Sequence, residues 1–168
     1  WLASVIGDGL RGLDYLQRRP DVKPEHLGVI GHGAGGGLAL YSAALDERLR
    51  ATVIDNYVGG GIDPLEVLGH GCDFVPSLRR YVELSDVVRL IAPRPVMFVY
   101  PMRRPATRMA RVMFDKMRPT YEAFSCPDRT RFLEEEDRDR NMVAARNWFD
   151  RWLVEEDDTS VLLWAPRE

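Results

Sequence analysis

His70, Cys72 and Asp73 form a compact set of polar side chains whose types could support chemistry. A cysteine beside a histidine can form a thiolate nucleophile, and histidine, cysteine and aspartate can together bind a metal ion. Both functions need side chains that converge on one atom, and near neighbours on one irregular segment do so poorly. We therefore expect no metal site and no cofactor, although His70 and Cys72 stay among the residues expected to line a pocket.

A second group surrounds the glycine-rich turn at residues 27–37, LGVIGHGAGGG. A short apolar run leads into this turn and a helical pattern follows it, which is typical of a strand–turn–helix unit. In α/β-hydrolases such a unit is the nucleophile elbow, with the pattern Gly-x-Ser-x-Gly. The same frame places Gly33 at the central position, where the backbone is expected to take a positive φ. Glycine tolerates that conformation but has no side chain that could attack a carbonyl.

The same turn also fits the dinucleotide-binding pattern Gly-x-Gly-x-x-Gly over Gly31–Gly36. That pattern is accompanied by an acidic residue about 20 residues later, at the end of the next strand. Asp55 occupies such a place. A nucleotide-binding domain is therefore an alternative to a hydrolase-like one.

The elements that must position these residues alternate along the chain, which favours an α/β fold with a mostly parallel sheet and flanking helices. Short apolar or β-branched runs predict strands at residues 27–30, 51–57, 96–100, 130–133 and 161–164. Apolar residues at helical spacing predict helices over residues 2–16, 38–45, 82–90, 109–117 and 142–152.

Three irregularities interrupt this alternation. Residues 58–90 are a long connection, which we interpret as a lid-like insertion in a single domain spanning residues 1–168. Pro119 is expected to end or kink the helix before it. The charged run 134–140 is expected to be a solvated loop, and the methionines of 109–117 are expected to fill the core.

Several longer segments carry a resemblance to a known family: RGLDYLQRRPDV, HLGVIGHGAGGG, LYSAALDERLRATV, FVPSLRRYVELSDVVRLIAPRPV and NWFDRWL. Between about residues 8 and 154 the chain resembles the dienelactone-hydrolase and acetylxylan-esterase-like branch of the α/β-hydrolases. The resemblance implies the C-terminal half of that fold, with about four strands and helices on both faces.

The resemblance also implies where a catalytic triad would lie. The nucleophile position falls on Gly33. The acid position, in the loop after the IAPRP strand, falls on Arg104, and the histidine position falls near Asp139 by a gapless count. No histidine lies in residues 134–140, so all three triad positions are degenerate. A serine nucleophile needs its base, and the base needs its orienting acid. We therefore expect no active Ser-His-Asp triad.

Other parts of the site are expected to survive. The amide of Ala34 would remain as one oxyanion donor at the start of a helix. His32 is expected to pack or to form a hydrogen bond, while Asp55 is a possible displaced acid at the end of its strand. Tyr57 completes the expected pocket, which would take a small-molecule ester or sugar.

Composition excludes several function classes. The net charge is −3 and 45% of residues are hydrophobic, so neither nucleic acid nor a membrane is an expected partner. Cys72 and Cys126 are too few for a disulfide framework and are expected to be free thiols. No targeting segment is visible, and the sequence does not indicate a cellular location.

The elbow strand is central in the complete fold but would be an exposed apolar edge here. We therefore expect the N-terminal part of the same fold, or another chain, to cover it. The interpretation that follows is a catalytically inactive esterase-like domain with ligand-binding or structural function. An active carboxylic-ester hydrolase completed by residues outside this chain is the other alternative.

Overall fold

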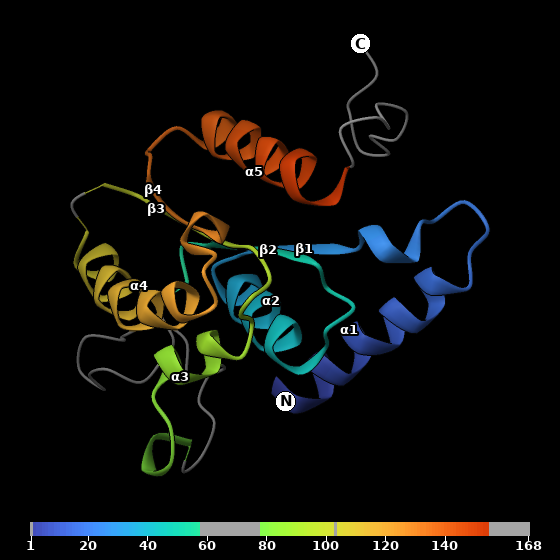
Figure 1. Ribbon diagram of the computed structural model, residues 1–168, viewed down its shortest axis with the longest axis horizontal. Coiled ribbons are helices and arrows are strands. Elements are labelled where there is room, and N and C mark those ends of the chain that lie inside the picture. The colour runs from blue at the N-terminus through green and yellow to red at the C-terminus, as the bar shows by residue number, and fades with distance from the viewer. Residues whose placement is uncertain (1, 58–77, 103, 155–168) are drawn as a thin grey trace.

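The computed structural model describes residues 2–57, 78–102 and 104–154 (Figure 1). Its centre is a four-stranded parallel sheet with the order β1-β2-β3-β4, as the sequence predicts. The strands are β1 (Gly28–His32), β2 (Ala51–Asp55), β3 (Val96–Tyr100) and β4 (Thr130–Glu134). Residues 161–164, where a fifth strand is predicted, lie outside the described residues.

Helices cover both faces of this sheet (Figure 1). One face carries α2 (Ala34–Leu45), α3 (Leu84–Arg89) and α4 (Pro105–Ala123), while α5 (Arg138–Leu153) lies across the other. The first helix, α1 (Leu2–Gln17), packs against α2. Three short 3₁₀ turns complete the described part: η1 (Pro24–His26), η3 (Leu78–Arg80) and η4 (Pro127–Arg129).

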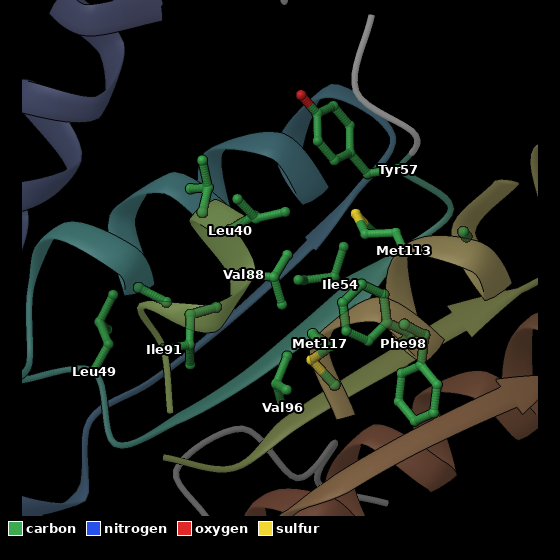
Figure 2. Packing of buried hydrophobic residues seen from close by; sticks show 14 of the residues in the cluster. Leu40, Leu49, Ile54, Tyr57, Val88, Ile91, Val96, Phe98, Met113 and Met117 are labelled. Atoms are coloured by element: carbon green, nitrogen blue, oxygen red, sulfur yellow. The ribbon is translucent and has the colours of Figure 1, made fainter. Parts of the chain in front are cut away.

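All five residues of β3 are buried. Their side chains point alternately to the two faces of the sheet and so contribute to the core on both sides. Val96 and Phe98 face the larger cluster beneath α2, α3 and α4, which Figure 2 shows. Met97 and Val99 face α5, where they pack with Trp148. Each fully buried apolar side chain contributes roughly 1.5–3 kcal/mol, so this central strand with both faces covered anchors the fold.

The sheet has an open edge at β1. In contrast to β3, the residues of β1 alternate between exposed and half-buried, and Ile30 is 42% exposed. Because β1 pairs only with β2 in the described sheet, its outer backbone groups have no neighbouring strand. This observation agrees with the expectation of an apolar sheet edge.

The predicted boundaries need corrections in two places. Residues 84–90 are not part of a lid, because Val87 and Val88 of α3 are buried in the core. Residues 58–77 lie outside the described residues. The charged run 134–140 is not one loop: β4 extends through Glu134, and α5 begins at Arg138 because the Asp137 carboxylate accepts hydrogen bonds from the amides of its first turn.

Pro119 is expected to end or kink its helix, and it does not end it, because α4 continues through Pro119 to Ala123. Proline removes one hydrogen bond, but the next turn is held by burial of Tyr121, whose hydroxyl donates to the carbonyl of Arg94 at 2.7 Å. Met113 and Met117 fill the core as predicted, whereas Val112 is exposed.

The IAPRP segment closes the opposite end of α2. The Arg94 guanidinium donates to the carbonyls of Ala43 at 2.7 Å, Leu49 at 2.8 Å and Asp46 at 2.9 Å. These groups include helix-end carbonyls that have no donor within α2. Partial burial lowers the pKa of Arg94, and its charge stays paired with these carbonyl dipoles.

Candidate functional site

The turn between β1 and α2 has the geometry expected of an elbow. Gly33 takes φ 56° and ψ −124°, and α2 begins at Ala34 directly after it. The amide of Gly33 donates to the carbonyl of Asp55 at 2.9 Å, which ties the turn to the end of β2. A Cβ atom built on Gly33 meets nothing within 4 Å, so space for a side chain remains where a nucleophile would stand.

The neighbouring glycines are required by close packing. A Cβ atom on Gly31 would lie 1.9 Å from the carbonyl oxygen of Gly35. A Cβ atom on Gly37 would lie 2.6 Å from the ring of Tyr57. These contacts bring the first turn of α2 directly onto the sheet. The amide of Ala34, in the first helical position, has no acceptor within the helix and is available to a ligand oxygen.

His32 and Asp55 are the last residues of adjacent strands and are register partners. The Nδ1 atom of His32 lies 2.9 Å from Oδ2 of Asp55. An ionised carboxylate only accepts hydrogen bonds, so this contact requires a proton on Nδ1, and in the neutral imidazole the lone pair is then on Nε2. The His32 side chain is 67% exposed and that of Asp55 is 18% exposed.

His32 and Asp55 are both site residues predicted from the sequence, but their contact with each other is not predicted. The sequence gives Asp55 as a possible displaced acid, and the structure places an imidazole against its carboxylate. The available signal was positional, because each residue ends a strand and neighbouring parallel strands end at one sheet edge.

Tyr57 contributes to packing. Its side chain is buried against the start of α2, and its carbonyl accepts a hydrogen bond from the hydroxyl of Tyr100. Burial raises the pKa of Tyr100, which keeps that phenol protonated as a donor. The pair therefore fixes the backbone just beyond the site.

The other two positions at which the resemblance implies a triad residue carry neither an acid nor a histidine at the expected place. Arg104 is an exposed residue that precedes the first turn of α4. Asp139 lies in the first turn of α5, and the loop after β4 consists of residues 135–137. That loop contains two glutamates and one aspartate and no histidine.

The structure tests only some of the remaining site predictions. His70 and Cys72 lie outside the described residues. Cys126 is a buried free thiol, as expected. Within residues 2–57, 78–102 and 104–154, no cluster of three or more potential metal ligands occurs. In the same part of the chain, no helix combines the length and apolar character of a membrane span.

Comparisons with known proteins agree with this geometry. Residues 3–62 match the Dienelactone hydrolase family. The chain is 40% identical over 97 residues to "Putative hydrolase YtaP" of Bacillus subtilis (strain 168), an alignment that covers 54% of this chain and 32% of that protein. The chain therefore spans about a third of this curated relative.

Solved structures show the fold. A carbohydrate esterase family 15 (CE15) glucuronoyl esterase from Caldicellulosiruptor kristjansonii superposes with a TM-score of 0.73 at 16% identity, covering 99% of this chain and 56% of that one. A glucuronoyl esterase from Solibacter usitatus gives 0.69 at 16% identity, covering 89% and 48%. The chain has the α/β-hydrolase fold, over about half the length of these enzymes.

Proposed function

We propose that this α/β-hydrolase chain, a relative of the dienelactone hydrolases, is an esterase-like domain without serine-hydrolase catalysis that retains a site for an ester or sugar ligand. The observation that carries the proposal is Gly33, which occupies the centre of an elbow with the nucleophile's backbone geometry. An acyl-enzyme cannot form at a residue without a side-chain nucleophile.

Two further observations support this proposal. Arg104 stands at the position of the acid, and residues 135–137 provide no imidazole at the position of the base. The ligand-binding part rests on the free amide of Ala34 at the start of α2 and on the named esterase relatives. Nothing in the comparisons supports the nucleotide-binding alternative.

The open edge at β1 supports a proposal about partners. We propose that the N-terminal part of the same fold, or a second chain, covers Ile30 and the outer backbone groups of this strand. The half-length match to the solved esterases favours the first of these occupants. Neither nucleic acid nor a membrane enters this proposal.

The decisive experiment treats the purified chain with a fluorescent fluorophosphonate and follows p-nitrophenyl acetate hydrolysis beside it. We expect no covalent labelling, because the reagent needs an activated serine. Stoichiometric labelling that also abolishes ester hydrolysis would refute the proposal. That outcome would favour an active carboxylic-ester hydrolase completed by residues outside the elbow.

A further inference from the structure

The hydrogen-bonded pair of His32 and Asp55 has no part in the function proposed above. We infer that it is a general-base dyad that activates water for direct attack on an ester bound at the carboxyl edge of the sheet. This inference rests on the proposed function in one respect: the elbow offers no serine, so water is the nucleophile.

The pair has the orientation that general-base catalysis requires. The contact from Nδ1 of His32 to Asp55 favours the tautomer with its proton on Nδ1, and in the neutral form of that imidazole Nε2 carries the lone pair. Asp55 is mostly buried, whereas most of the imidazole is exposed. The carboxylate is therefore largely shielded from solvent, while most of the ring is in contact with it.

A purely structural role explains this pair less well. The turn is anchored by the backbone bond from the Gly33 amide to the Asp55 carbonyl, which does not involve either side chain. The imidazole is mostly exposed and His32 belongs to neither hydrophobic cluster, so its side chain adds no apolar packing to the core.

The site also contains a group suited to the charge that develops. Ala34, two residues after His32, begins α2 and has its amide free of any helical acceptor. An oxyanion near a helix N-terminus is stabilised by that amide and by the helix dipole. A base and an oxyanion donor thus flank the vacant side-chain position of Gly33.

The reaction balances as hydrolysis. Nε2 of His32 takes one proton from water as the water oxygen forms a bond to the ester carbonyl carbon. The tetrahedral intermediate then collapses, the bond from carbon to the alcohol oxygen breaks, and the imidazolium returns its proton to the leaving alkoxide. The products are a carboxylic acid and an alcohol, and no acyl-enzyme forms.

The test compares His32→Gln and Asp55→Asn with the matched control His26→Gln, which changes a histidine in η1, away from the carboxyl edge. Steady-state hydrolysis of p-nitrophenyl acetate is measured with and without fluorophosphonate. We expect turnover that resists the reagent, shows no burst of p-nitrophenol, and falls about 100-fold in His32→Gln. The control should keep the wild-type rate.

Asp55 is a positioning residue, and its role needs a separate readout. Imidazole ¹⁵N shifts should report an Nδ1–H tautomer for His32 in the wild-type chain and a mixture of tautomers in Asp55→Asn. kcat should fall in that variant while KM stays unchanged. Equal kcat values for the wild-type and Asp55→Asn proteins would overturn the positioning role.

The remaining outcomes separate the two proposals. Absence of turnover above buffer, or equal rates for His32→Gln and His26→Gln, overturns the dyad but leaves the proposed function intact. Turnover abolished by fluorophosphonate overturns the dyad and the proposed function together. Melting temperatures of the variants confirm that each remains folded.

Discussion

The amide of Gly33 donates to the carbonyl of Asp55 at 2.9 Å, which ties the backbone of the elbow to the end of the neighbouring strand. It leaves the Gly33 position itself open, with φ 56° and no atom within 4 Å of an added Cβ. This turn therefore has the backbone geometry of a nucleophile elbow although its central residue has no nucleophilic side chain.

Gly33→Ser tests that separation directly. The side chain has space, but a non-glycine residue in this backbone region costs about 1–3 kcal/mol. We expect a lower free energy of unfolding by urea and still no fluorophosphonate labelling, because Arg104 and residues 135–137 supply no acid and base. Gly35→Ser is the matched control, since its added Cβ also meets nothing within 4 Å and its φ is helical. Labelling of Gly33→Ser alone would contradict the degenerate-triad interpretation.

Gly31→Ala should be far more damaging than Gly35→Ala. The new Cβ on Gly31 would lie 1.9 Å from a backbone oxygen, so β1 and α2 would have to separate. We expect the free energy of unfolding of Gly31→Ala to fall by roughly 2 kcal/mol or more and that of Gly35→Ala to change little. Chemical denaturation measures both. Similar midpoints for the two variants would mean that the turn is less tightly packed than described.

Arg94→Met should destabilise the chain by roughly 2–4 kcal/mol, because it leaves three carbonyls at the end of α2 and in the connection after it without their donor. Arg151→Met is the control, since Arg151 is exposed and its contact to Asp128 is 3.3 Å long. The comparison uses urea unfolding followed by circular dichroism. A loss no larger than that of the control would show that water replaces the guanidinium at these carbonyls.

Asp46 should make stability depend on acid pH. Hydrogen bonds from Arg48 hold the pKa of Asp46 below its ordinary 3.8, and its side chain is only 12% exposed. Since folding favours the carboxylate, its stabilisation is complete above the ordinary pKa and is lost as pH falls through the folded one. Asp46→Asn should therefore lower the free energy of unfolding at pH 7 and change it less near pH 2. Asp8→Asn, on the exposed face of α1, should change little at either pH. An equal loss at both pH values would contradict this account.

The edge of β1 should make the isolated chain prone to association. Ile30 is 42% exposed on a strand with one free side, and such edges pair with other strands. We expect concentration-dependent oligomers in sedimentation velocity, which Ile30→Lys should reduce because a charge on the edge opposes pairing. Val112→Lys, on the exposed face of α4, is the control. A monomer at all concentrations would argue against this edge as a contact surface.

Local patterns in the sequence determined much of this protein. Apolar and β-branched runs predict the four strands to within a few residues, because burial on both faces demands continuous apolar residues. The spacing of Gly31, Gly33 and Gly35 predicts the elbow, in which Gly31 has no room for a Cβ atom and Gly33 takes a positive φ. The same residue pattern shows that the central position, Gly33, has no nucleophilic side chain.

Only the tertiary structure decided which distant groups meet. His32 and Asp55 are 23 residues apart, and their contact depends on the register between β1 and β2, which no local pattern encodes. Likewise, α4 continues through Pro119 because burial of Tyr121 outweighs one lost hydrogen bond. Sequence periodicity reports which side chains prefer burial, whereas pairings between elements depend on how those buried faces pack together.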